Sequence, residues 1–227
     1  MEIQEFIARE KARCDCFRIL AACFYQPERD IFLEEETLES LFSQLGRVCP
    51  EAGPFAATMK ESMLAWNNED LLVEYSSLFV GPTELKAAPY GSVYLEKGRR
   101  VMGDSTMEVN DYYRKMGLTM NKDFKELPDH IAVELEFMYY LAFQEVEALQ
   151  KGETDKARYF LDAQEEFSER FMRQWVPVFC DKITQGTDNP YYQSLAGCLS
   201  VFINSKAGTF PVSDESMKIT TQVYFCA

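Results

Sequence analysis

The feature that most constrains this chain is the spacing of its apolar residues, which follows a helical period over most of its length. The first such stripe stops at Gln26-Pro27, and its members are Ile3, Phe6, Ile7, Cys14, Phe17, Leu20, Ala21 and Phe24. Residues three and four apart share one face of an α-helix, so the stripe predicts a helix with a buried face. Similar stripes follow along the chain and predict a single all-α domain over residues 1–227, built as a bundle of roughly ten helices.

The helical period is lost over residues 81–104, which separate the two helical halves. The turn-forming residues of this stretch are Pro82, Pro89, Gly91, Gly98 and Gly103. They predict a long structured loop and a hinge between the two halves. The sequence Ser105-Thr106-Met107-Glu108 has capping-box spacing and predicts the next helix start. Pro128 is suited to the first turn of a later long helix, and Pro177 is expected to interrupt or kink the helix that contains it.

Composition and charge narrow the classes of partner. The chain has 227 residues, of which 47 % are hydrophobic and 14 % aromatic, enough for a substantial core without disulfide support. The formal net charge of −14 argues against binding to nucleic acid or anionic membranes and favours a cationic partner. The seven cysteines are scattered and odd in number, which is typical of reduced thiols in the cytoplasm. Neither a signal peptide nor a membrane span is recognisable in the sequence.

The supply of reactive residues is limited. His130 is the single histidine, which excludes multi-histidine metal sites, and the cysteine spacing is not that of a structural zinc site. Phosphate-binding glycine loops and a G-x-S-x-G elbow are missing from the sequence. Read singly, His130 is a polar residue at a helix start, Asp129 a first-turn carboxylate that favours the helix dipole, and Tyr75 part of a core stripe.

Four ordered blocks change that interpretation. They are Tyr75-Ser76-Ser77-Leu78-Phe79-Val80-Gly81-Pro82, Ala88-Pro89-Tyr90-Gly91-Ser92-Val93-Tyr94-Leu95, Gly103-Asp104-Ser105-Thr106, and Pro128-Asp129-His130 with Glu134-Leu135-Glu136-Phe137-Met138. In order and spacing they resemble the TorD/DmsD family of molybdoenzyme maturation chaperones. The resemblance covers roughly residues 69–202, and the helical amino-terminal third agrees with the family in character.

The resemblance implies an all-helical cytoplasmic chaperone that is not an enzyme and has no cofactor or metal of its own. Its partner would be the precursor or apo subunit of a molybdenum-dependent oxidoreductase, bound at the twin-arginine signal peptide until the cofactor is inserted. The chaperone would be a monomer or a homodimer. The peptide-binding positions carry over onto Tyr75, Gly81, Pro82, Pro89, Tyr90, Ser92, Tyr94, Asp129 and His130. Tyr75 and Tyr94 stand where some relatives have tryptophan, and Gly91 where many have an acidic residue.

Several alternatives stay open at this stage. A twin-arginine leader presents guanidinium groups followed by an apolar segment, so its receptor needs carboxylates beside an aromatic groove. Residues 89–94 could equally be a packed crossover that joins the helical halves. Asp129 is either a contact for arginine or part of the scaffold. The alternative functions are a chaperone for a non-exported molybdoenzyme subunit, as in the nitrate-reductase branch, and a nucleotide hydrolase that uses His130.

Overall fold

The structure is a computed structural model that describes residues 3–81, 85–98, 100–121 and 124–205. Its α-helices are α1 (Ile3–Cys23), α2 (Arg29–Glu34), α3 (Thr37–Val48), α4 (Gly53–Ala65), α5 (Asn68–Tyr75), α6 (Ser92–Leu95), α7 (Asp104–Lys115), α8 (Ile131–Gln150), α9 (Thr154–Phe167), α10 (Arg173–Gly186) and α11 (Pro190–Asn204). A 3₁₀ turn covers Pro50–Ala52, and π-helical turns cover Ser76–Val80 and Ser168–Met172. The described ranges contain no strand, which confirms the all-α prediction.

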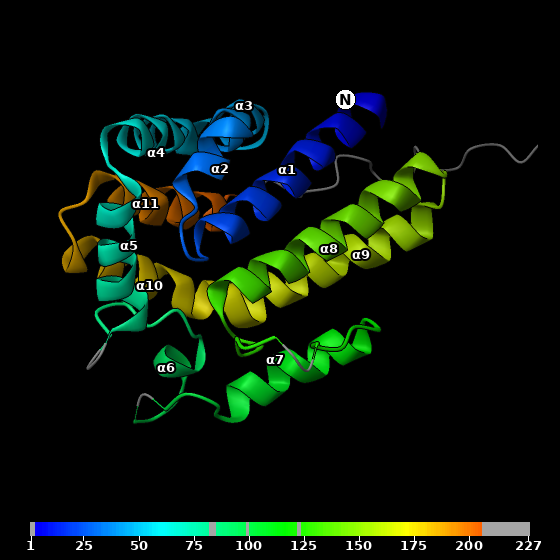
Figure 1. Cartoon of the computed structure of the whole chain (residues 1–227). Coiled ribbons are helices and arrows are strands. Elements are labelled where there is room, and N and C mark those ends of the chain that lie inside the picture. The colour runs from blue at the N-terminus through cyan, green and yellow to red at the C-terminus, as the bar shows by residue number, and fades with distance from the viewer. Residues whose placement is uncertain (1–2, 82–84, 99, 122–123, 206–227) are drawn as a thin grey trace, which may run out of the picture.

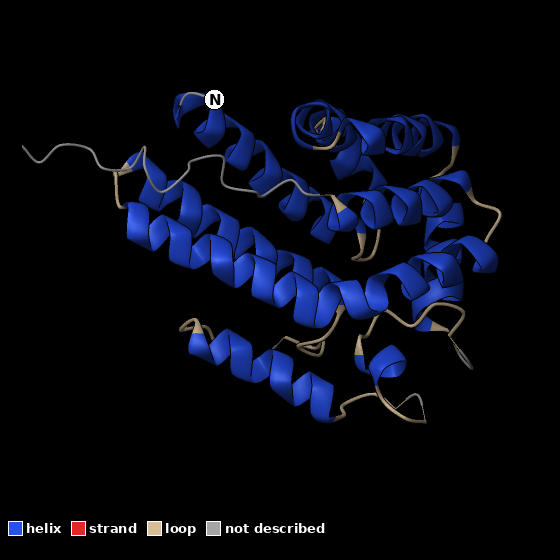
Figure 2. Cartoon of the chain, turned by 180° about the vertical axis from the view of Figure 1, so that it is seen from behind, coloured by secondary structure: helices blue, strands red, loops and turns tan. Residues whose placement is uncertain are grey.

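The long helices pack around a central pair, which consists of α1 and α8. Helix α8 lies between α1 and α9, and α1 also packs on α3 (Figure 1). Helix α11 bridges α4 and α10, and the short helices α6 and α7 lie on the opposite side of the molecule from α3 and α4 (Figures 1 and 2). The large side chains Trp175, Tyr191 and Tyr192 are fully buried in the core that these helices share. The stripe of α1 is therefore the buried face of this helix, as its spacing predicts, except for Ile3, which is exposed at the helix start.

A buried polar network joins the three central helices. Arg13 on α1 donates to Glu10 at 2.6 Å, to Glu145 on α8 at 3.2 Å and to Gln164 on α9 at 2.6 Å. All four residues are at most 5 % exposed. One guanidinium thus faces two carboxylates in a region that water does not reach, which makes this network sensitive to the protonation state of its members.

Two predicted helix starts are corrected by the structure. Helix α7 is preceded by Gly103 rather than by a capping serine, and the Glu96 carboxylate accepts from the Ser105 backbone N–H at 2.7 Å. The capping box is therefore wrong, because a side chain from the loop supplies the acceptor. Helix α8 starts at Ile131 and not at Pro128, whose carbonyl accepts from the Tyr113 hydroxyl at 2.8 Å.

The expectation that Pro177 interrupts its helix is wrong. Helix α10 continues through this proline to Gly186 without ending. The irregularity lies a few residues upstream, at the π-helical turn Ser168–Met172 between α9 and α10. A π turn widens the helix by a single residue, so the apolar period alone does not locate it.

Candidate functional site

The predicted loop is attached to the start of α8 by main-chain hydrogen bonds. Ile131 N–H donates to the Pro89 carbonyl and Gly91 N–H to the Asp129 carbonyl, each at 2.8 Å. Tyr90 and His130 form an isolated antiparallel bridge between these contacts. The loop is therefore held in one position relative to α8, which lowers the entropy that it would lose on binding a partner.

Asp129 strengthens the same attachment through its side chain. Its Oδ2 accepts from the backbone N–H of Ser92 at 2.8 Å, in the first turn of α6. Asp129 is 1 % exposed and Ser92 is fully buried. The carboxylate thus anchors the loop from inside, a geometry that favours the scaffold interpretation of this residue.

His130 is the N-cap of α8, with its ring Nδ1 accepting from the Ala132 N–H at 3.1 Å. An accepting Nδ1 carries no hydrogen, so the neutral ring carries its hydrogen on Nε2. Burial lowers the pKa of His130 to about 4, although the Glu126 and Asp129 carboxylates act in the opposite direction. His130 is therefore neutral at physiological pH, and its Nε2 lies 3.9 Å from a Glu126 carboxylate oxygen.

Three tyrosines surround the neighbouring Glu126. The Tyr90 hydroxyl donates to Glu126 Oε2 at 2.8 Å, while Tyr25 stacks on the His130 ring with centroids 6.2 Å apart. The pKa of Tyr75 is raised to about 12, mainly by burial and in addition by the charge of Glu126. We call Tyr25, Tyr75, Tyr90, Glu126 and His130 the tyrosine–glutamate cluster.

The cluster is partly open to solvent. The side chain of Glu126 is 34 % exposed, and the three tyrosines are half-buried. Phe124 meets Tyr25 edge to face at 6.4 Å, and it lines, together with Glu126, a hollow of about 260 Å³ beside α7. A carboxylate framed by aromatic rings at the edge of a hollow is suited to a guanidinium or ammonium group.

The remaining predicted residues form the support of this site. Tyr94 stacks on the buried Trp175 with ring centroids 5.5 Å apart, and its hydroxyl donates to the Ala88 carbonyl at 2.9 Å. Gly81 ends the π-helical turn with a φ of 45°, a conformation that favours glycine. Pro82 lies outside the described residues.

The structure thus divides the predicted residues into two groups. Tyr75, Tyr90 and His130 belong to the tyrosine–glutamate cluster, whereas the other described ones shape the loop beneath it, namely Gly81, Pro89, Ser92, Tyr94 and Asp129. Sequence reasoning missed Tyr25 and Glu126. Their only signals are their positions, beside Gln26-Pro27 and two residues before Pro128.

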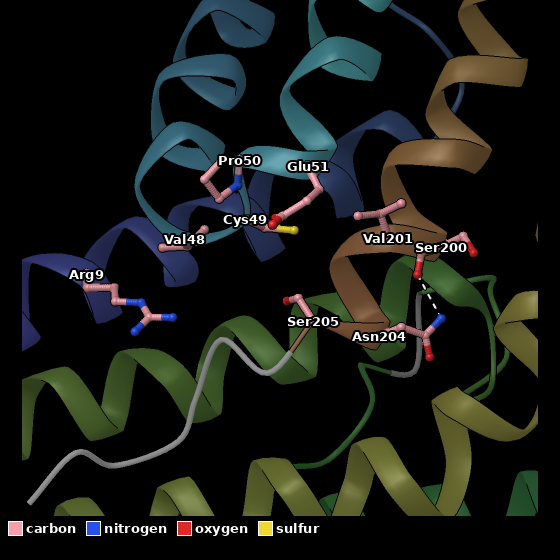
Figure 3. A pocket seen from close by; sticks show the side chains of 9 residues that line it. All are labelled: Arg9, Val48, Cys49, Pro50, Glu51, Ser200, Val201, Asn204 and Ser205. Atoms are coloured by element: carbon pink, nitrogen blue, oxygen red, sulfur yellow. Dashed lines mark hydrogen bonds between the residues drawn. The ribbon is translucent and has the colours of Figure 1, made fainter.

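A second hollow, of about 670 Å³, lies away from these residues. It is surrounded by side chains from α1, from residues 48–51 and from the end of α11, among them Arg9, Glu51 and Asn204 (Figure 3). It contains none of the predicted site residues. Over the described part of the chain, three or more His, Cys, Asp or Glu side chains nowhere gather as a metal site would require, and the six described cysteines are free and buried. Nor does any helix there have the length and apolar character needed to cross a membrane.

Comparison with known proteins shows which family this chain resembles. The model of the family described as nitrate reductase delta subunit matches residues 46–181, more than half of the chain. The chaperone protein TorD of Photobacterium profundum is 25 % identical over 207 residues, covering 88 % of this chain and 94 % of the relative. The TorD of Vibrio atlanticus is 28 % identical over 133 residues, covering 59 % of this chain and 60 % of the relative.

A solved structure agrees in fold. The crystal structure of a protein described as a redox enzyme maturation protein, from Archaeoglobus fulgidus, superposes with a TM-score of 0.50. It is 22 % identical, and the match covers 82 % of this chain and 93 % of that one. The motifs of the loop and of the α8 start, the all-helical fold and the family model agree with one another. The chain therefore belongs to the nitrate reductase delta subunit family, as a non-enzymatic protein of the TorD/DmsD chaperone type that serves molybdoenzyme maturation.

Proposed function

We propose that the chain binds the twin-arginine signal peptide of a molybdenum-cofactor oxidoreductase subunit, holding the precursor or apo subunit before export. Binding is reversible and involves no chemical step. The observation that carries the proposal is the position of Glu126, whose carboxylate accepts from Tyr90 and whose side chain is about one-third exposed near three tyrosines.

The chemistry of this cluster matches an arginine side chain. A guanidinium is planar, so it can donate to a carboxylate while its face lies on an aromatic ring. Glu126 supplies the acceptor, its charge acts on the nearby Tyr25 and Tyr75 hydroxyl groups, and the Phe124 ring packs on Tyr25. The exposed Glu136 lies near the Tyr25 hydroxyl and adds a second carboxylate at the same edge.

In this proposal Asp129 and His130 are positioning residues. Asp129 fixes the loop that carries Tyr90, and His130 presents a neutral ring between Tyr25 and Tyr90. A neutral His130 adds no positive charge that would repel arginine. The family motif then acts through the placement of the tyrosines, while Glu126 makes the ionic contact.

Titration calorimetry with a synthetic leader peptide tests the proposal. Glu126→Gln removes the charge but keeps the size, so the dissociation constant should rise about tenfold, the loss of a charged hydrogen bond. Glu165→Gln, at an exposed position on α9, removes the same net charge away from the cluster and should leave the affinity within about twofold. A leader with both arginines replaced by lysine should bind more weakly to the wild type. Equal affinities for both variants would contradict the proposal.

The family description favours a second candidate, a chaperone for a subunit that is not exported. Such a chaperone would recognise the apo subunit without reading a twin-arginine leader. Binding of the apo subunit with and without its leader distinguishes the two candidates. Undiminished affinity after removal of the leader supports the second candidate, and loss of binding supports the first.

A further inference from the structure

An apolar hollow lies at the other side of the molecule, where α2 and α3 meet α4. Here Phe32, Leu33, Leu38 and Leu64 line a hollow of about 340 Å³. Leu64 is 59 % exposed, although it sits on a regular helix with well-buried neighbours. The tyrosine–glutamate cluster lies instead near α6 and the start of α8, and α6 is on the opposite side from α3 and α4 (Figure 1).

The turn that borders this hollow is strongly acidic, and its Glu36 lines the hollow together with Glu39 and Lys60. Glu34, Glu35 and Glu36 follow one another along the turn from α2 to α3, and all three are exposed. None of the three forms an ion pair with a described residue, whereas Glu39 is paired with Lys60 across the hollow. We call the four apolar residues and these three glutamates the acidic-rimmed groove.

The turn from α2 to α3 contains an unusual backbone conformation. Glu36 has a φ of 50°, in the left-handed region that non-glycine residues seldom adopt. This conformation reverses the chain between α2 and α3, so that the half-buried side chains of α2 form one wall of the groove. Glu36 is the N-cap residue of α3, but its side chain makes no capping hydrogen bond.

We propose that the acidic-rimmed groove docks a basic amphipathic helix of a partner protein. Leucine-type side chains of such a helix would enter the hollow beside Leu64, and its lysine or arginine residues would meet the three free glutamates. A second copy of this chain is a poor occupant, because its own charge of −14 would be brought against the same acidic rim. The proposal is independent of the leader-binding function, since it uses other residues on another side of the molecule.

The probe is a fluorescent model helix of roughly 18 residues, with leucines at helical spacing and lysines along both flanks. A matched helix carries glutamate in place of lysine. Fluorescence anisotropy measures the affinity of each for the wild type and for Leu64→Ser. Val73→Ser is the control, because Val73 is equally exposed, at 62 %, but lies on α5.

The basic helix should bind, and Leu64→Ser should weaken it roughly fivefold or more while Val73→Ser stays within about twofold. Replacing Glu34, Glu35 and Glu36 by glutamine should also reduce the affinity and its salt dependence. The matched triple variant Asp162→Asn, Glu165→Gln and Asp181→Asn removes the same charge elsewhere. It should reduce the affinity and its salt dependence less. Equal effects of the paired variants, or equal binding of the acidic helix, would overturn the proposal.

Hydrogen exchange locates the bound helix independently. Slower exchange in residues 31–39 and 60–65 supports docking in the acidic-rimmed groove. Slower exchange only around residues 85–95 would place the helix at the tyrosine–glutamate cluster and would overturn the assignment. The leader-peptide titrations with Glu126→Gln do not depend on this result, so failure of one proposal is distinguishable from failure of the other.

Discussion

Asp129→Asn is expected to weaken the fold and to affect the partner only indirectly. In the wild type, a buried carboxylate oxygen accepts from Ser92 N–H at 2.8 Å. Asparagine can keep that acceptor, but its NH₂ group then replaces Oδ1, a buried atom without a hydrogen-bond partner in the described structure. The charge-assisted bond becomes a neutral one and a buried donor is left unpaired, which together destabilise the protein by about 1–3 kcal/mol. For a chain of this size the melting temperature falls by roughly 2–12 °C.

Urea unfolding followed by circular dichroism measures the stability, and leader-peptide calorimetry measures the affinity on the same preparations. Asp111→Asn is the control, because Asp111 is exposed and pairs with Arg114 only at the surface. The control should unfold at nearly the wild-type urea concentration. An unchanged midpoint for Asp129→Asn, combined with tenfold weaker leader binding, would show that the carboxylate contacts the partner and would refute its role as an anchor.

Two further predictions concern the interior. Burial raises the pKa of Glu145 above its usual 4.5 in spite of the Arg13 charge, so the folded state favours the neutral acid and loses stability as the pH rises above about 4.5. Glu145→Gln should therefore gain stability relative to the wild type between about pH 5 and pH 8, and parallel urea midpoints across that range would contradict it. Gly91→Ala should destabilise by about 1–3 kcal/mol, because a Cβ would lie 3.0 Å from the Trp175 indole nitrogen. Unaltered thermal unfolding of Gly91→Ala would show that the indole can move away.

The helices were predictable from the sequence because burial imposes the period that the sequence displays. The stripe from Ile3 to Phe24 and the cap formed by Asn189 and Pro190 depend on residues close together in the chain, and both appear as expected. The start of α7 was not predictable in this way. Its acceptor is Glu96, which reaches the helix from a loop whose path no local pattern determines.

The candidate site likewise combines residues that lie close together in the sequence with residues that only the fold brings together. The motif residues Pro89, Ser92 and Asp129 were identifiable because the two short blocks that contain them resemble the motifs of the family. Tyr25 and Glu126 come from two other segments, and only the packing of α1 against α8 brings them together. Their proximity is a property of the tertiary structure, so a single sequence carries no pattern for it.

The placement of the motif residues also indicates how the buried Asp129 affects the exposed part of the proposed site, namely Tyr90 and Glu126. Asp129 accepts from the backbone N–H groups of Gly91 and Ser92, the two residues that follow Tyr90, so the position of the Tyr90 ring depends on the anchor beneath it. The Tyr90 hydroxyl in turn orients the Glu126 carboxylate. Without the anchor both groups would be free to move. Ordering them would then cost conformational entropy when a partner binds. In the proposed function, buried residues of this motif thus act on the leader peptide through the geometry of Tyr90 and Glu126.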